Sequence, residues 1–322
     1  MKPKIFLHIG QPKTATTSSQ GFFHENAGAL QSEGILYPAS FLQGVAHHPV
    51  GGAFMKHKAD WVRLDDPAKM RKSLDEEISE KRPHTVLIST EALFYEGVDV
   101  STVREWLSDY QVEVIVNLRQ QDDWLESALR DNIKTGHFSG SIESYLQRMQ
   151  GRLNYFDVLS EWGQHFGNEN VKVITFEPRK GMLPPEHELL DLIGCTDPKK
   201  YGVAKKANER LSRDALAWLS LSPDVRRIGA QHFRMFHLLA RWSVLNPDKP
   251  EYSNFLPPRF RQKIRESYAD SNEAVARTFM NRSDGVLFQH PSEISDEWKE
   301  YGGLSAARAV AIGQWLFNAT RK

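Results

Sequence analysis

The sequence predicts an α/β fold: a P-loop-like open parallel sheet flanked by helices, with a helical C-terminal region. Three observations predict it. Short apolar runs alternate with amphipathic helical patterns over residues 1–204, as in a parallel sheet covered on both faces. A turn rich in hydroxyl residues follows the first of these runs. After about residue 205 only helical patterns remain.

Local signals define each element. The first strand is expected at 4–9, and a helix from about Thr16 to Gln31 ends at Gly34, the residue type that commonly stops helices. The other expected strands are 85–89, 112–118 and 171–176, and the helices among them are 122–135 and 155–166. The C-terminal helices are expected at 211–221, 225–245, 258–280 and 304–319. Without a flexible linker, we expect one domain over 1–322, with an α/β nucleotide-binding core at 1–204 and a mainly helical cap at 205–322.

Composition limits the classes of partner. Lysine and arginine together number 41, as do aspartate and glutamate, so the formal net charge is zero. This balance argues against a nucleic-acid-coating protein, whose basic face usually raises the pI, but allows a small basic pocket for one anion. The sequence does not specify an oligomeric state.

Cysteine and hydropathy indicate the compartment. The single cysteine, Cys195, excludes an internal disulfide and is expected to be a small buried hydrophobe. The apolar run at residues 5–7 is too short for a signal-peptide core, and no stretch approaches the ~20 apolar residues of a membrane span. We therefore expect a soluble, cytoplasmic protein without a membrane span.

The most informative stretch is the turn after the first predicted strand. Gly10 ends the strand, Lys13 lies in the turn, and Thr14, Thr16, Thr17 and Ser18 surround the start of the helix. Unpaired N–H groups and the positive dipole end of a helix attract phosphate, and the hydroxyls and Lys13 add donors and charge. Helix capping alone explains one or two hydroxyls, not four together with a lysine. The sequence therefore predicts a phosphate-binding loop.

A nucleoside-triphosphate P-loop does not fit this stretch. That motif has four residues between its glycines and a lysine directly before Ser or Thr, whereas only two residues separate Gly10 from Lys13 and no second glycine precedes Lys13. A magnesium ligand would be an acidic residue at the end of a later strand, and neither later strand ends in one. The residues there are Ser89-Thr90-Glu91 and Asn117-Leu118-Arg119. No metal site is expected.

The loop resembles the first signature of the PAPS-dependent sulfotransferases, Pro-Lys-[Thr/Ser]-Gly-Thr-[Thr/Ser]. Residues 12–17 match at five of six positions, with Ala15 in place of glycine. If that position needs a positive φ, alanine costs ~1 kcal/mol. The second family signature is an arginine at the end of a strand and a serine eight residues later, matched by Arg119 and Ser127. Weaker similarity to the bacterial, carbohydrate-type branch covers most of the chain.

The resemblance implies a donor, 3′-phosphoadenosine 5′-phosphosulfate (PAPS), and a hydroxyl or amine acceptor that is a glycan or small polar molecule. Its 5′-phosphosulfate would lie on Lys13, Thr14, Ala15, Thr16, Thr17 and Ser18, and its 3′-phosphate on Arg119 and Ser127. Arg119 alone also allows a surface ion pair with Asp122 or Asp123. Two interpretations are open for Lys205, Lys206 and Asn208. They either close over the nucleotide or belong to an ordinary solvated loop before a helix.

The chemistry needs two further roles. Lys13 is expected to neutralise charge on the leaving oxygen. Glu91, directly after a predicted strand, is the candidate general base, although it could equally supply first-turn charge after a Thr90 cap. His24, His47 and His48 are alternatives, and the His47–His48 pair is expected to be exposed in a long loop over 41–61. That loop is either an acceptor-binding lid or a surface insertion.

Two other functions remain open at this stage. A small-molecule kinase would bind ATP with magnesium and would not need Arg119. A nucleotide-binding sensor or scaffold without turnover would be explained by Ala15 weakening the loop.

Overall fold

The computed structural model of the chain describes residues 2–57, 61–95, 97–135, 141–177, 183–204, 210–221 and 229–320. Contacts group the chain into two compact units. The first comprises Met1–Gln120, Gly151–Ala207 and Tyr268–Pro291, and the second comprises Gln121–Gln150, Asn208–Ser267 and Ser292–Lys322. The single-domain organisation with a boundary near residue 205 stays a prediction.

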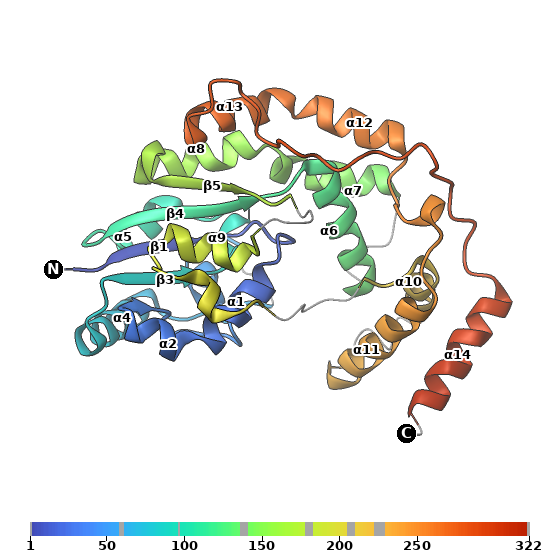
Figure 1. Cartoon of the computed structure of the whole chain (residues 1–322), viewed down its shortest axis with the longest axis horizontal. Coiled ribbons are helices and arrows are strands. Elements are labelled where there is room, and N and C mark those ends of the chain that lie inside the picture. The colour runs from blue at the N-terminus through green and yellow to red at the C-terminus, as the bar shows by residue number, and fades with distance from the viewer. Residues whose placement is uncertain are drawn as a thin grey trace. The chain divides into compact units, whose positions relative to one another are not determined.

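A parallel sheet forms the centre of the first unit (Figure 1). Its strands in the order β2-β3-β1-β4-β5 are Ile35–Leu36, Thr85–Ser89, Lys4–His8, Gln111–Leu118 and Val171–Thr175. Every strand pairing is parallel, which confirms the predicted α/β fold. The four expected strands begin and end within one residue of their predicted bounds. Strand β2, with two residues, carries too little pattern to predict.

Helices cover both faces of this sheet, because successive strand residues point to opposite sides. Ile5 and Leu7 enter one core, which α4 (Pro67–Lys81), α5 (Val100–Trp106), α8 (Tyr155–Phe166) and α13 (Ala269–Met280) complete. Phe6 enters the other core, built with α1 (Thr16–Glu25), α2 (Ala27–Ser32) and α9 (Pro185–Leu192), and α1 and α9 lie in front of the sheet in Figure 1. Both cores exclude water from the strands.

The first predicted helix is two helices. Asn26 separates α1 from α2, and its side-chain Nδ2 donates to Phe22 O at 2.9 Å. Gly34 follows α2 at φ 76°, and a Cβ there would lie 2.5 Å from the His84 ring. Glycine is therefore required where the helix was predicted to stop.

Several helices were not predicted. Short ones offer little periodicity, but α4 had a start signal, because Asp66 accepts from Ala68 N at 2.8 Å just before Pro67. The loop expected at 41–61 contains a helix, α3, at His48–Phe54. The short 3₁₀ turns are η1 (Glu91–Phe94), η2 (Gln150–Leu153), η3 (Asn168–Asn170), η4 (Pro198–Tyr201) and η6 (Pro250–Tyr252).

The second unit is helical. Its helices are α6 (Gln121–Thr135), α7 (Ile142–Met149), α10 (Arg213–Ser220), α11 (Gly229–Leu245), α12 (Pro258–Ser267) and α14 (Ala306–Thr320). Leu216, Leu239 and Ile312 pack in a core shared by α10, α11 and α14. The predicted 258–280 helix is two, since Tyr268 separates α12 from α13. The first predicted residues of the 225–245 helix lie outside the described residues.

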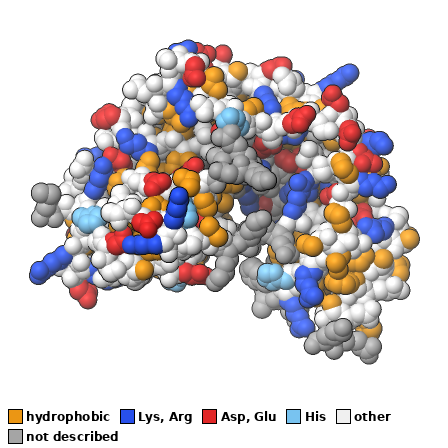
Figure 2. Space-filling view, in the orientation of Figure 1, with side chains coloured by type: hydrophobic (Ala, Val, Ile, Leu, Met, Phe, Trp, Pro, Cys, Tyr) orange, Lys and Arg blue, Asp and Glu red, His pale blue; other side chains and the backbone are white. Residues whose placement is uncertain are grey.

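The surface carries both signs of charge. Lys and Arg side chains are interspersed with Asp and Glu on the face that Figure 2 shows, in keeping with the zero net charge. Over the described ranges, every helix is too short or too polar to cross a lipid bilayer.

Candidate active site

Three predicted site segments meet at one edge of the sheet. The loop at 10–18 follows β1, Glu91 follows β3 and Arg119 follows β4. Because the strands are parallel and His8 is in register with both Ser89 and Ile115, their carboxyl ends lie together. Open α/β sheets bind ligands at this edge.

Gly10 brings the loop against Glu91. Its φ is 100°, and a Cβ at this position would lie 2.9 Å from the Cβ of Glu91. Only glycine allows both the conformation and the close approach. The candidate base is therefore packed beside the start of the predicted phosphate-binding loop.

The loop has a backbone suited to an anion. Lys13 and Ala15 adopt left-handed conformations, with φ of 71° and 64°. Ala15 is the N-cap of α1, and no side chain in the described part of the chain caps that helix end. Alternation of left- and right-handed residues turns successive N–H groups toward one side, forming a concavity that binds anions. Ala15 thus occupies the positive-φ position whose cost was anticipated from the sequence.

The loop hydroxyls differ in their surroundings. Thr14 is buried, and its Oγ1 donates to Gln11 O at 2.6 Å, so its proton is engaged within the loop. Thr16 is buried at the start of α1, whereas Thr17 is exposed and Ser18 is half-buried. Thr14 therefore stabilises the turn itself.

A buried amide that sequence reasoning missed holds the loop to β4. Gln11 N donates to Asn117 O at 2.9 Å, and Gln11 Oε1 accepts from Arg119 N at 3.2 Å. Gln11 Nε2 donates to the hydroxyl of Tyr155, which in turn donates to Arg119 O at 2.6 Å. No local pattern indicates this contact, because Gln11 and Tyr155 are 144 residues apart.

Arg119 lies beside the loop at 10–18. Its Nη1 donates to Lys13 O at 3.3 Å, and its guanidinium lies 5.6 Å from the centre of the Phe176 ring. The structure therefore brings Lys13 and Arg119 to the same edge. Asp122 and Asp123, the carboxylates that offered Arg119 a surface ion pair, have Arg261 as a partner.

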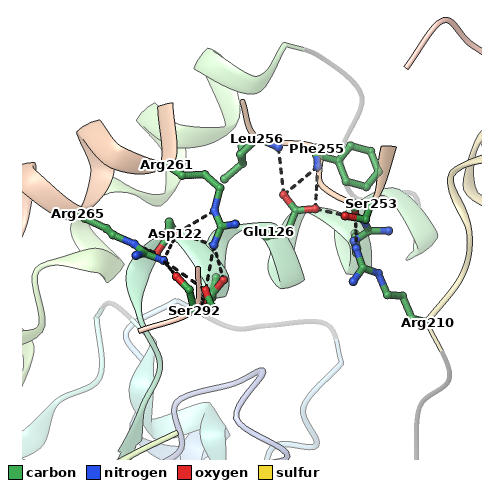
Figure 3. A network of polar contacts seen from close by, with 11 residues as sticks. Asp122, Glu126, Arg210, Ser253, Phe255, Leu256, Arg261, Arg265 and Ser292 are labelled. Carbon is green, nitrogen blue, oxygen red and sulfur yellow. Dashed lines mark hydrogen bonds and ion pairs between the residues drawn. The ribbon is translucent and has the colours of Figure 1, made fainter. Parts of the chain in front are cut away.

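Ser127 lies on α6, in the second unit, whereas Arg119 belongs to the first. A network of polar contacts fixes α6 within its unit (Figure 3). Buried Asp122 binds Arg261 and Arg265, and Glu126 accepts from the backbone N–H groups of Phe255 and Leu256. A shared Arg119–Ser127 phosphate site stays a prediction, and Lys205, Lys206 and Asn208 lie outside the described residues.

Glu91 is held in place from two sides. Its Oε2 accepts from Gln20 Nε2 at 2.8 Å and lies 4.0 Å from His48 Nδ1. The side chain is 15% exposed, so an acceptor could reach it. Thr90 caps η1 by accepting from Ala92 N at 3.2 Å. Glu91 thus lies both in the first turn after the Thr90 cap and beside the loop at 10–18. The structural interpretation and the candidate base are therefore compatible.

The alternative histidines are distinguishable by burial. The expectation that His47 is exposed is wrong: it donates to Pro38 O and accepts from Ser89 N, and burial lowers its pKa to about 4. His48 is partly buried, with Nδ1 3.1 Å from Thr90 Oγ1; burial lowers its pKa and nearby Glu91 opposes this. His48 is therefore the histidine that faces the site.

His8 lies beneath the site in β1. Its Nδ1 is 2.8 Å from Ser89 Oγ, and the residue is 1% exposed, so His8 lies in the core. Burial lowers its pKa to about 4, so His8 is neutral at pH 7.

The similarity of this chain to known proteins is distant. No protein-family profile matches the sequence. An uncharacterized protein of Archaeoglobus fulgidus is 24% identical over 208 residues, 60% of this chain and 53% of that protein, so the chain spans about half the length of this relative. A sulfotransferase from Alicyclobacillus acidocaldarius has a similar structure, with a TM-score of 0.41, 18% identity and coverage of 74% of this chain and 96% of that one. A likeness at this level is not evidence of a shared activity.

Proposed function

We propose that this protein is a PAPS-dependent sulfotransferase that acts on a hydroxyl or amine of a carbohydrate or other polar acceptor. The observation that supports the proposal is the meeting of Lys13, Arg119 and Glu91 at the carboxyl edge of one parallel sheet. Two cations suit a donor with two anionic ends, and a carboxylate beside them suits a base.

The residues present fit such a donor. The phosphate cradle is formed by two parts of the loop. Lys13 and Ala15 have left-handed conformations, and no side chain in the described part of the chain caps the N-terminus of α1. Arg119, next to this cradle, would hold the second phosphate. PAPS, when bound, supplies a sulfuryl group activated by its phosphate leaving group.

The chain's own residues then have separate roles. Glu91 takes the proton from the acceptor hydroxyl as the acceptor oxygen bonds to sulfur and the bond from sulfur to the bridging oxygen breaks. Lys13 stabilises the negative charge that remains on the bridging oxygen. Gln20, which donates to Glu91 at 2.8 Å, keeps the carboxylate aimed at the loop.

Ligand-induced stabilisation tests donor recognition. Adenosine 3′,5′-bisphosphate should raise the melting temperature far more than ADP, because Arg119 recognises a 3′-phosphate that ADP lacks. Arg119→Ala should remove this preference, whereas Arg277→Ala, which removes an exposed arginine paired with Glu273, should keep it. Equal shifts with both nucleotides in the unaltered protein would contradict the proposal and favour a kinase.

Replacing the candidate base separates binding from chemistry. Glu91→Gln keeps a similar shape but cannot accept a proton, so we expect transfer to fall by 10²-fold or more, the typical contribution of general base catalysis. The shift produced by adenosine 3′,5′-bisphosphate should be unchanged. The measurement is incubation with sulfur-labelled PAPS and a panel of glycans, lipids, phenols and amines. Full activity in this variant would exclude Glu91 as the base, and binding without any turnover in the unaltered protein would favour a sensor or scaffold.

A further inference from the structure

A series of aromatic and cationic side chains leads away from Glu91. The His48 ring meets Trp61 edge to face, with centres 5.0 Å apart, and the Trp61 and Tyr95 rings have centres 6.0 Å apart. The Arg152 guanidinium lies 4.6 Å from the centre of the Tyr95 ring. We call His48, Trp61, Tyr95 and Arg152 the aromatic strip. All four belong to the first unit, as does Glu91.

The most exposed member of the strip is held in position. Trp61 is 44% exposed, although its side chain is large and mostly apolar. Its carbonyl accepts from Gln43 Nε2 at 2.8 Å, and Gln43 Oε1 accepts from Arg63 N at 2.8 Å. These two bonds clamp the backbone around Trp61. An exposed indole on a fixed backbone is suited to contact a ligand.

The strip is joined to the candidate base at its other end. His48 Nδ1 lies 4.0 Å from Glu91 Oε2. A molecule lying along Trp61 and Tyr95 would therefore have one end near the carboxylate and the other near Arg152.

We propose that the aromatic strip is the acceptor subsite and that it selects a hydroxylated ring carrying an anionic substituent; this proposal rests on the proposed function. The flat face of a sugar or aromatic ring would stack on Trp61. A carboxylate on the ring would bind Arg152, whose planar guanidinium already stacks on Tyr95 and is suited to paired hydrogen bonds with a carboxylate. A ring hydroxyl at the opposite end would reach Glu91.

Two kinds of molecule share this chemistry, a sugar acid and a phenolic acid. Methyl glucuronide compared with methyl glucoside tests the first, and 4-hydroxyphenylacetate compared with 4-hydroxyphenylethanol tests the second. Each pair has a similar ring and differs in the negative charge. The pair that shows the larger charge preference identifies the kind of ring.

The experiment is calorimetric titration of each compound into the full chain saturated with adenosine 3′,5′-bisphosphate. The charged member of one pair should bind about tenfold or more tightly than its neutral counterpart, as for hydrogen bonds to a charged group. Arg152→Ala should remove this difference, Arg152→Lys should retain part of it, and Arg277→Ala should leave it unchanged. Trp61→Ala should weaken charged and neutral members alike, since stacking does not depend on the charge.

The possible results separate the two proposals. If neither pair shows a charge preference, or if Arg152→Ala leaves it intact, the acceptor subsite is wrong, whatever happens at the donor site. If adenosine 3′,5′-bisphosphate does not bind while an Arg152-dependent preference remains, the subsite stands and the sulfotransferase proposal falls. Melting curves of each variant check that it is folded, and Trp61 and Arg152 both lie outside the buried core.

Discussion

Ala15 and Gly10 both adopt positive φ in the same loop, but only Gly10 has the residue type that this conformation favours. At position 10 an added Cβ would clash with Glu91, so glycine is the residue that this position requires. Alanine at φ 64° instead carries a strain of ~1–2 kcal/mol. Lys13 and the hydroxyls allowed a phosphate-binding loop to be predicted, because charge and donors are visible in the residue types. The tie from Gln11 to Tyr155 could not be predicted, because it depends on a contact between distant segments.

Ala15→Gly should therefore stabilise the protein by up to about 1 kcal/mol, the relief of strain being partly offset by the greater freedom of glycine in the unfolded chain. The control is Ala307→Gly, at an exposed position in the first turn of α14, where glycine should destabilise by less than the ~1 kcal/mol that it costs in a helix interior. Urea unfolding of both variants measures the difference. Destabilisation by Ala15→Gly would mean that the left-handed conformation is not retained in solution.

At the scale of elements, strands were easier to predict than helices. Apolar β-rich runs such as Thr85–Ser89 are bounded sharply by polar residues, and their bounds were predicted directly. Long helical patterns ran past real breaks at Asn26 and Tyr268, since both residues interrupt a helix without proline or glycine. The polar contacts of α6 were also beyond sequence reasoning, because Asp122 binds arginines about 140 residues further along the chain.

Those contacts predict which carboxylate of α6 contributes most to the stability of the protein. Asp122 is fully buried between Arg261 and Arg265, so Asp122→Ala leaves two arginines without their shared carboxylate and should cost about 3–5 kcal/mol. Asp131→Ala, on the same helix, removes a half-exposed carboxylate 3.8 Å from Lys134 and should cost less than about 1 kcal/mol. Chemical unfolding of the full chain compares the two. Similar costs would contradict the assigned role of Asp122.

At the scale of the whole molecule, two buried histidines link stability to pH. Burial lowers the pKa of His8 and of His47 to about 4, below the ordinary 6.5. Between these two values the unfolded chain binds more protons than the folded one, so stability is fully present above pH 6.5 and is lost as pH falls toward 4. Burial of this kind cannot be judged from a His47–His48 pair beside a Gly-rich segment, which is why the sequence favoured an exposed loop.

Lowering the pH from 7 to 5 should therefore reduce the free energy of unfolding by about 2 kcal/mol for each of these histidines. Urea midpoints measured across this range provide the test. His47→Gln should flatten the dependence, since glutamine keeps polar atoms near Pro38 and Ser89 but does not titrate. A slope for His47→Gln identical to that of the unaltered protein would contradict the assignment.

The parallel register of β1, β3 and β4 has a practical consequence for redesign. Gly10, Glu91 and Arg119 stand one or two residues beyond their strands, so the hydrogen-bond ladder of the sheet dictates the spacing between them. Trp61 instead belongs to the crossover from β2 to β3, where the hydrogen bonds of the sheet do not determine its position. Under the proposed function, grafting a different crossover in place of this one would change the proposed acceptor subsite and leave Gly10, Glu91 and Arg119 at their original separation.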